Sequence, residues 1–195
     1  MMKFSGLFRM LAIASLLAMP ALANANPISL GFEGDYAPLN WSLSRGGIPA
    51  AGGGYPDIID APDSITLVGG DEGCGFGPCF MDLTIASPVI GLVEFAWDYR
   101  TLDDSPEFDT FGFLLNGAYT QLTDDLGDFN QFGVESFLVG IGDVFGFRLD
   151  CQDCQFGSAD AIIYDFSVTD VPEPGALALL AAGLLGGAFV RRRRR

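Results

Sequence analysis

Apolar and polar residues alternate along most of the middle of the chain, as they do in β-strands that have one buried and one exposed face. The clearest case is residues 91–100, where Val93, Phe95, Trp97 and Tyr99 would share the buried face. No stretch before the C-terminal tail carries an apolar stripe at helical spacing over a useful length. The pattern therefore predicts an all-β domain.

Short runs of this kind recur about every ten residues, separated by glycine, aspartate, asparagine and serine. The strands that we expect are 28–33, 39–44, 64–68, 80–86, 91–100, 110–115, 118–122, 132–139, 144–150 and 160–168. We expect 28–33 and 39–44 to form a first strand pair, and residues 45–63 to form a long loop. This number of antiparallel strands predicts a two-sheet β-sandwich, jelly-roll-like in arrangement.

Two of these segments predict details of local structure beyond the presence of a strand. Asn116-Gly117 is typical of a type I′ turn, which would join its flanking strands in a tight hairpin. In the last segment, Ile162, Tyr164, Phe166 and Val168 alternate with the residues between them, so regular pleating would place all four on one face.

Residues 1–23 predict a signal peptide, because Lys3 and Arg9 precede an apolar segment and the small residues around Ala23 suit signal peptidase. Cleavage after Ala23 is our first expectation and cleavage after Ala25 the second. The alternative is an uncleaved N-terminal anchor, which Pro20 disfavours by ending the apolar segment early. The expected partners are the Sec machinery and signal peptidase. The exported domain would then comprise residues 24–170.

Residues 171–195 form a second apolar terminus. Pro172, Glu173 and Pro174 precede an apolar stretch, 175–190, that would be about 24 Å long as a helix, against about 30 Å for a bilayer core. A basic cluster at the end of an apolar segment stays on the cytoplasmic side, which predicts a C-terminal transmembrane helix in the inner membrane. The cluster is Arg191, Arg192, Arg193, Arg194 and Arg195.

This tail resembles the PEP-CTERM sorting domain in its Pro172-Glu173-Pro174 motif, its apolar helix and its terminal arginines. The resemblance covers about the last eighth of the chain. It implies processing by an exosortase-type sorting peptidase in a Gram-negative bacterium that makes exopolysaccharide. The protein would pass through a membrane-anchored intermediate to the cell surface or the extracellular matrix. The alternative is a permanent C-terminal anchor.

The net charge of the exported domain limits the classes of partner that it can bind. The whole chain has a formal charge of −15, but the domain keeps only three of the ten basic residues, Arg45, Arg100 and Arg148, against 24 acidic residues. Its formal charge is therefore about −21. Such a field repels phosphate backbones, so nucleic acid is excluded as a partner, whereas divalent cations are favoured.

The chain contains no histidine, which removes catalytic arrangements that use imidazole and the usual zinc ligands. Its four cysteines are spaced as Cys74-x4-Cys79 and Cys151-x2-Cys154. In an exported protein we expect two local disulfides, Cys74 with Cys79 and Cys151 with Cys154. A zinc or redox role is the alternative.

The ends of the domain also resemble the first and last strands of jelly-roll carbohydrate-binding modules, through residues 31–35 with Trp41 and residues 163–168. In such sandwiches a calcium ion ties the first strand to the last. The resemblance implies Glu33, Asp35 and Asp165 as its ligands, and solvated carboxylates are the alternative. The middle of the domain, residues 109–117 and 142–147, resembles a recurrent domain of PEP-CTERM proteins.

Two further groups of residues are candidates for binding. A second acidic cluster, made up of Asp103, Asp104, Glu107 and Asp109, predicts either an ion site or a solvated loop. Aromatic side chains in or beside loops would provide platforms for sugar rings, whereas Trp97, Tyr99 and Tyr164 are expected in the core. The candidate platforms are Tyr36, Trp41, Tyr55, Phe108 and Tyr119.

These patterns favour a non-catalytic exported protein with a structural or adhesive role that binds exopolysaccharide or calcium. The alternative function is a secreted glycan-active enzyme that uses paired carboxylates. No acidic pair in the sequence stands out for that role.

Overall fold

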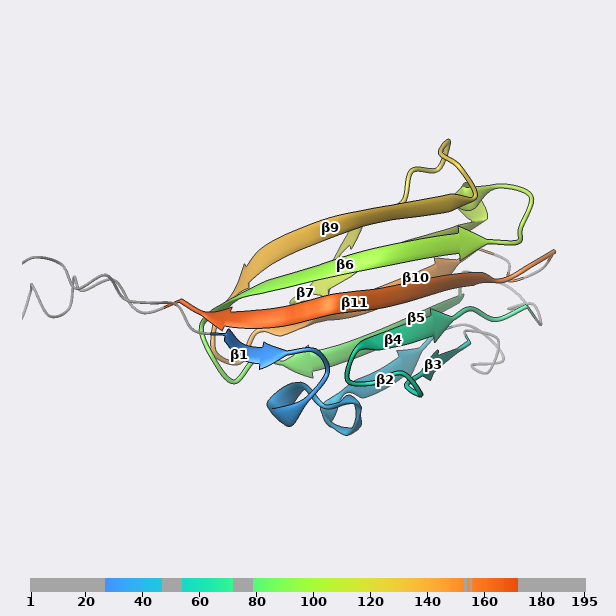
Figure 1. Ribbon diagram of the computed structural model, residues 1–195. Coiled ribbons are helices and arrows are strands. Elements are labelled where there is room, and N and C mark those ends of the chain that lie inside the picture. Colours follow the sequence, from blue (N-terminus) through green and yellow to red (C-terminus); the bar gives the residue numbers. More distant parts are fainter. Residues whose placement is uncertain (1–26, 47–53, 72–78, 153, 155, 172–195) are drawn as a thin grey trace, which may run out of the picture. The chain divides into compact units, whose positions relative to one another are not determined.

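The computed structural model describes residues 27–46, 54–71, 79–152, 154 and 156–171 (Figure 1). Within these ranges no helix is long and apolar enough to span a membrane. The strands are β1 (Pro27–Leu30), β2 (Ser42–Arg45), β3 (Tyr55–Asp57), β4 (Ser64–Val68), β5 (Cys79–Ala86), β6 (Gly91–Thr101), β7 (Asp109–Leu115), β8 (Ala118–Gln121), β9 (Asn130–Val139), β10 (Val144–Cys151) and β11 (Ala159–Asp170). The 3-10 helices are η1 (Gly34–Tyr36), η2 (Pro38–Asn40) and η4 (Pro106–Phe108).

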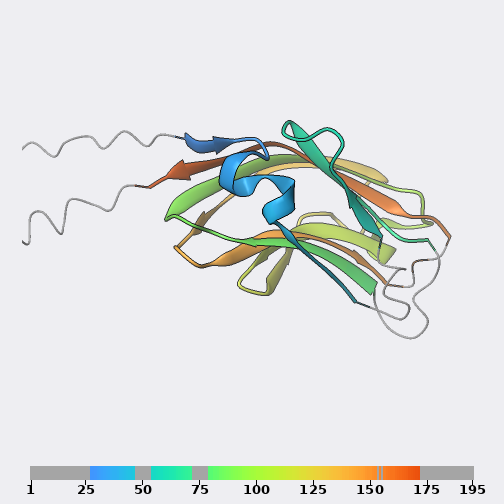
Figure 2. The same cartoon turned by 90° about the horizontal axis from the view of Figure 1, so that it is seen from below.

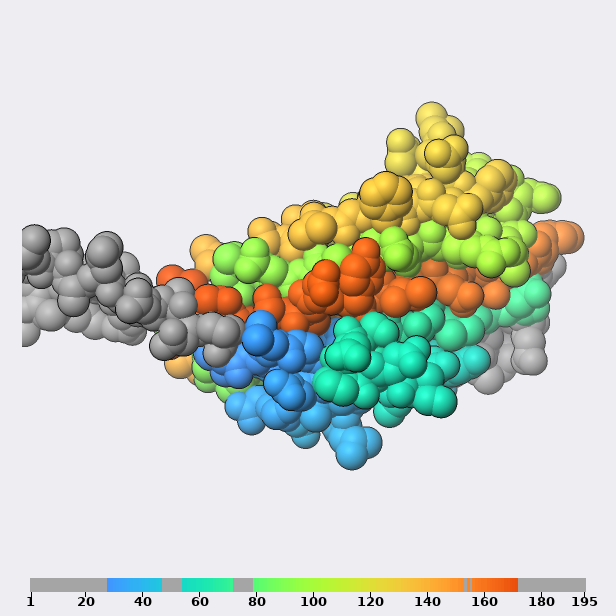
Figure 3. Space-filling view, viewed as in Figure 1, coloured from blue at the N-terminus to red at the C-terminus, as the bar shows by residue number. Residues whose placement is uncertain are grey.

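The strands form two antiparallel sheets that pack face to face, which confirms the predicted two-sheet sandwich (Figures 1 and 2). One sheet has the order β3-β4-β11-β6-β9, with β1 also pairing with β11. The other has the order β2-β5-β10-β7-β8. In the space-filling view β4, β11, β6 and β9 lie side by side on the outer face of the six-stranded sheet (Figure 3).

Aromatic side chains fill the space between the sheets. The face of β6 predicted to be buried is confirmed, because Val93, Phe95, Trp97 and Tyr99 are all at most 6% exposed. Phe147 of the opposite sheet packs edge-on against Phe95, with ring centroids 5.0 Å apart. Such tilted contacts are the favoured geometry for aromatic rings in a core. The largest fully buried side chains are Tyr36, Tyr99, Phe32, Phe95, Phe111, Phe145, Phe147, Phe166, Ile65, Leu67, Met81 and Ile163.

The predicted first strand pair is wrong. β1 pairs with β11 and β2 pairs with β5, so the two strands belong to different sheets. η1 and η2 carry the chain across the edge between the layers (Figure 2). Tyr36 and Trp41 of this crossing insert into the core, and the Trp41 Nε1–H donates to the Tyr36 carbonyl at 2.9 Å. Burial of these two rings stabilises the crossing.

The predicted loop 45–63 contains a short strand. Tyr55–Asp57 forms β3, which pairs with β4 at the edge of the six-stranded sheet. Pro56 sits in this strand without breaking the sheet, because an edge strand has one side on which no N–H is needed. The hairpin prediction is confirmed by positive φ angles at Asn116 and Gly117, 51° and 82°.

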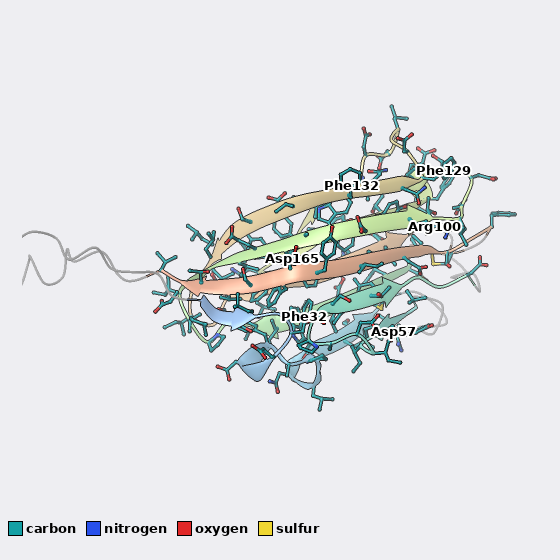
Figure 4. The ribbon with its side chains drawn as sticks, viewed as in Figure 1. Phe32, Asp57, Arg100, Phe129, Phe132 and Asp165 are labelled. Carbon is teal, nitrogen blue, oxygen red and sulfur yellow. A yellow bond between two sulfur atoms is a disulfide. The ribbon has the colours of Figure 1, made fainter. Side chains whose placement is uncertain are left out.

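A bulge in β11 changes which residues face the core. The register with β6 shifts between Tyr164 and Ser167, and Asp165 adopts a left-handed φ of 49° (Figure 4). Ile163 is therefore buried before the bulge and Phe166 after it, whereas Ile162 is 40% exposed. The prediction that Ile162 and Phe166 share a face is wrong, because one extra residue in a strand reverses the alternation beyond it.

β1 and the end of β11 lie together at one end of the sandwich. Pro27 is the register partner of Thr169, and Asp170 that of Gly91 at the start of β6. At the other end of β6, Thr101 pairs with Ala159, and the chain then turns through η4 into β7. The start of β7 is thus one strand length away from the residues where the described chain enters and leaves.

Candidate functional site

The outer face of the five-stranded sheet holds a cavity of about 530 Å³. We call it the sheet-face cavity. It contains two of the five aromatic residues predicted as sugar platforms, Phe108 and Tyr119, and one member of the second acidic cluster, Glu107. Its lining is Glu107, Phe108, Thr110, Tyr119, Gln121, Asp125, Asp150 and Gln152.

Alternation along three adjacent strands creates this cavity. Leu149 and Phe111 point into the core, so their neighbours Asp150 and Thr110 point outward. Asp150 and Thr110 are register partners across β10 and β7. The 3-10 helix η4 precedes β7 and is fixed to the end of β10, because the Gln152 N–H donates to the Phe108 carbonyl at 2.8 Å.

An ion pair supports the floor of the cavity. Arg148 donates from Nε and Nη2 to the two carboxylate oxygens of Asp82 at 2.6 and 2.8 Å. Its guanidinium carbon lies 4.3 Å from the centroid of the Phe80 ring and 5.5 Å from that of Tyr119, both within cation–π range. The hydrogen bond to Asp82 is the main cause that raises the pKa of Arg148. Fixed by Asp82, the Arg148 guanidinium packs against the Tyr119 ring and stabilises its position.

Tyr119 is positioned from two further directions. Its hydroxyl lies 3.1 Å from Thr110 Oγ1, at hydrogen-bonding distance. Gly112 lies beneath the ring, and a Cβ there would be 2.7 Å from Tyr119 Cε2 and 2.1 Å from the Thr120 carbonyl oxygen. Only glycine permits this close approach. Burial raises the pKa of the Tyr119 hydroxyl, so the side chain stays neutral.

Asp150 is the most unusual carboxyl group of the cavity. Burial raises its pKa, and the charge of Arg148 acts in the opposite direction. Its Oδ1 atom is buried and has no hydrogen-bond partner within the part of the chain that the structure describes. A buried acceptor without a donor costs about 1–3 kcal/mol, which a ligand that supplies a donor would recover.

The sequence missed Arg148 and Asp150 as site residues. A signal was present, since Arg148 and Asp150 alternate with Phe147 and Leu149, and Asp82 alternates with Met81 and Leu83. These charged positions on the outer faces of adjacent strands indicate a polar sheet face. Strand order, which a single sequence does not give, was needed to bring them together.

The other predicted sugar platforms lie elsewhere. Tyr36 and Trp41 are 0% and 8% exposed in the core, so their prediction as surface platforms is wrong. They lie beside loops in sequence but close the edge between the sheets. Tyr55 is 53% exposed on the edge strand β3, outside the sheet-face cavity. Trp97 and Tyr99 are in the core as expected, whereas Tyr164 is only half-buried, so its prediction as a core residue is wrong.

The three residues implied as calcium ligands are exposed. Glu33 and Asp35 lie at η1, and Asp165 lies in the β11 bulge (Figure 4). Asp165 lines a second cavity of about 530 Å³ together with Asp63, and neither Glu33 nor Asp35 belongs to that lining. Among the described residues no three acidic or cysteine side chains are grouped closely enough to hold a metal ion. Calcium binding stays a prediction.

The second acidic cluster divides into two buried and two exposed members. Asp109 and Asp103 are 1% and 5% exposed, and Thr101 Oγ1 donates to Asp109 Oδ2 at 3.0 Å. The Tyr99 hydroxyl donates to the Asp109 carbonyl. Asp104 and Glu107 are exposed. The buried pair therefore fixes the turn between β6 and β7, and Glu107 alone reaches the sheet-face cavity.

Three of the four cysteines lie together at one end of β5 and β10. Cys151 and Cys154 form the predicted disulfide, with Cα atoms 5.4 Å apart. Cys79, the register partner of Cys151, is also disulfide-bonded. Cys74 lies outside the described residues, so the predicted Cys74–Cys79 pairing stays a prediction.

Comparison with solved structures finds proteins of low similarity. The complex of TmCBM61 with β-1,4-galactotriose is 12% identical, with a TM-score of 0.38, and the match covers 71% of this chain and 92% of that one. The N-terminal cellulose-binding domain of Cellulomonas fimi β-1,4-glucanase C is 14% identical, with a TM-score of 0.34 and coverage of 76% and 99%. The β-glucosidase from Kluyveromyces marxianus, with bound glucose, is 11% identical, with a TM-score of 0.27. That match covers 44% of this chain but only 11% of the enzyme.

The predicted sorting residues, Pro172 to Pro174 and Arg191 to Arg195, lie outside the described residues, as does the predicted signal peptide. No curated protein sequence matches the chain. Residues 170–195 match the family model of the PEP-CTERM protein-sorting motif. This motif implies export and exosortase-type processing of a protein that its C-terminal region anchors beforehand. The chain thus carries a PEP-CTERM protein-sorting motif C-terminal to an antiparallel two-sheet β-sandwich.

Proposed function

We propose that this protein is a non-catalytic, exported glycan-binding protein that holds polysaccharide in the sheet-face cavity. The observation that carries the proposal is the joint placement of Phe108 and Tyr119 among hydrogen-bonding side chains in one cavity. Binding sites for small polar ligands combine an aromatic surface with a few convergent polar groups. Sugars match this combination, because their rings have apolar C–H faces and hydroxyl edges.

The role would be structural or adhesive. The Sec machinery and signal peptidase would export the chain, the inner membrane would hold it, and an exosortase-type peptidase would release it to the cell surface or matrix. There the sheet-face cavity would bind exopolysaccharide. The charge of the domain keeps it soluble and away from nucleic acid.

The binding experiment uses protein recovered from its producing cells and a panel of oligosaccharides, followed by titration calorimetry. Replacing Phe108 or Tyr119 with alanine is expected to weaken binding by about ten-fold or more, since a buried aromatic side chain contributes about 1.5–3 kcal/mol. Tyr55→Ala and Phe132→Ala are the matched controls, because both side chains are exposed and neither lines the cavity. Figure 4 labels Phe132 on β9. Equal losses in all four variants, or no binding by the parent protein, would refute the proposal.

A catalytic role is the competing function, because Glu107 and Asp150 line the same cavity and burial raises the pKa of Asp150. A raised pKa is what a general acid needs in glycoside hydrolysis. The bound oligosaccharide is therefore incubated with the protein and assayed for new reducing ends. Release that disappears in both Glu107→Gln and Asp150→Asn would establish hydrolysis in place of simple binding.

Sorting is tested separately by mass spectrometry of the protein from the producing cells. The proposal expects a mature chain that starts near Asn24 and lacks Arg191 to Arg195. An intact C-terminus would indicate a permanent anchor, and an intact N-terminus would contradict signal-peptide cleavage.

A further inference from the structure

The sheet-face cavity is anionic. Three carboxylates line it, from three separate segments: Glu107 in η4, Asp125 after β8 and Asp150 in β10. The nearby cation, Arg148, is already bonded through two nitrogens to Asp82. This arginine is shared between Asp82 and Asp150, so it offsets only part of the charge of the lining. A ligand that carries carboxylate or sulfate groups would be repelled.

Hydrogen-bond donors in the cavity are mostly used within the protein. Gln121 Nε2 donates to the Thr123 carbonyl at 2.8 Å and to Asp125 Oδ1 at 2.5 Å, which uses both of its N–H groups. Gln152 Nε2 donates to the Glu107 carbonyl at 3.4 Å. The hydroxyls of Thr110 and Tyr119 are within bonding distance of each other, so one of the two donates to the other.

Acceptors remain in excess. The carboxylates of Glu107 and Asp125, the side-chain carbonyls of both glutamines and Asp150 Oδ1 all accept and cannot donate while the acids are charged. Among these acceptors, Asp150 Oδ1 would gain most from a donor, since it is buried and has no partner among the described residues. The ligand must therefore supply donors, and a positive charge on those donors would match the three carboxylates.

We propose that the ligand of the sheet-face cavity is a glycan that carries protonated amino groups, such as a polymer containing free hexosamine. This inference rests on the proposed function and specifies its substrate class. An ammonium group supplies three donors and one positive charge, and charge-assisted hydrogen bonds are about twice as strong as neutral ones. Phe108 and Tyr119 provide the aromatic surface for the sugar rings between the charged groups.

The test compares three hexasaccharides that share linkage and length but differ at C2: β-1,4-linked glucosamine, N-acetylglucosamine and glucose. The protein recovered from its producing cells is titrated with each at about 150 mM salt, where long-range electrostatics are largely screened. The glucosamine hexamer is expected to bind about ten-fold more tightly than the other two. EDTA is expected to leave its binding unchanged, and loss of binding in EDTA would overturn the inference by showing that a metal mediates it.

Charge-removing variants locate the preference. Glu107→Gln and Asp150→Asn keep the shape of each side chain and are each expected to reduce the preference for glucosamine by about three-fold or more. Glu94→Gln is the matched control. Glu94 is exposed on the outer face of the six-stranded sheet, and its substitution removes the same charge from the domain. An equal reduction in Glu94→Gln would overturn the inference as non-specific attraction to an acidic protein.

The two proposals fail differently. If all three hexamers bind equally and Tyr119→Ala abolishes binding, the amino-glycan inference is wrong and the glycan-binding function stands. If no hexamer and no member of the wider oligosaccharide panel binds, both are wrong.

Discussion

Arg148 and Asp82 form a two-point ion pair on the outer face of the five-stranded sheet, with nitrogen–oxygen distances of 2.6 and 2.8 Å. Their side chains are only 21% and 13% exposed, so the pair is shielded from water on most sides. The guanidinium also lies against the rings of Phe80 and Tyr119. One cation thus connects β5, β10 and β8 beneath the sheet-face cavity.

Removing one partner of this pair should therefore be costly. Asp82→Ala leaves the Arg148 charge partly buried without its acceptor, and we expect the free energy of unfolding to fall by about 1–3 kcal/mol. Urea denaturation measures the loss. The double variant Asp82→Leu with Arg148→Met should recover much of it, because an apolar pair needs no partner. A loss no larger than that of the exposed control Glu94→Ala, within about 0.5 kcal/mol, would show that the pair is not stabilising.

The pKa values of Asp150 and Asp143 should be shifted in opposite directions from the ordinary aspartate value. Burial raises the pKa of Asp150 above the ordinary 3.8, whereas the Gly140 N–H and the Asn116 amide, which donate to its carboxylate, lower that of Asp143. Carboxyl NMR titration measures both values. Two pKa values on the same side of 3.8 would contradict the described environments.

The raised pKa of Asp150 also has a consequence for stability. A group whose pKa is raised on folding holds its proton more tightly in the native state, so its contribution is present at low pH and is lost as pH rises through the folded value. The Asp150→Asn variant lacks this loss. Its stability relative to the parent should therefore increase between about pH 3 and pH 7. A difference that stays constant with pH would show that Asp150 has an ordinary pKa.

Gly112 should not tolerate a side chain. A Cβ at this position would lie 2.1 Å from the Thr120 carbonyl oxygen, and backbone cannot yield cheaply there. We expect Gly112→Ala to lower the free energy of unfolding by about 1–3 kcal/mol and to displace the Tyr119 ring, which would weaken glycan binding. Gly140→Ala is the control, because its nearest contact is a side-chain oxygen at 3.2 Å. Similar effects for the two variants would contradict the proposed close approach.

The disulfide between Cys151 and Cys154 should matter more for binding than its short loop suggests. Closing so small a loop contributes about 2 kcal/mol by the chain-entropy model. The loop contains Gln152, which lines the sheet-face cavity and fixes Phe108 through its N–H. Replacing both cysteines with serine is expected to weaken glycan binding several-fold, measured by calorimetry at a temperature where the variant is folded. Unchanged affinity would show that the bridge does not position the cavity.

Local alternation predicted most of the fold. In β6 the spacing of Val93, Phe95, Trp97 and Tyr99 identified both the strand and its buried face, because both sheet faces there follow a period of two. β11 shows the limit of the same argument. The bulge at Asp165 reverses the faces, and an exposed aspartate gives no sequence signal of a left-handed φ.

The candidate site was only partly predictable. Phe108, Tyr119 and Glu107 could be found as loop aromatics and acids, but Tyr36 and Trp41 looked the same and proved to be core. What separates the two groups is which strands become neighbours. The order β5-β10-β7 depends on pairings between distant segments, so it lies beyond the reach of a local pattern, and only the β7–β8 hairpin was predicted from its turn.

The sheet-face cavity and the β1–β11 pair lie toward opposite ends of the sandwich. Pro27 and Thr169 are register partners at one end, whereas Phe108 and Asp150 lie toward the other end, near the turn from β6 into β7. The eleven residues of β6 span about 35 Å at about 3.3 Å per residue. A support attached where β11 ends would therefore lie most of the length of β6 away from the sheet-face cavity. A captured sugar polymer would be kept clear of that support by the rigidity of the sheet itself.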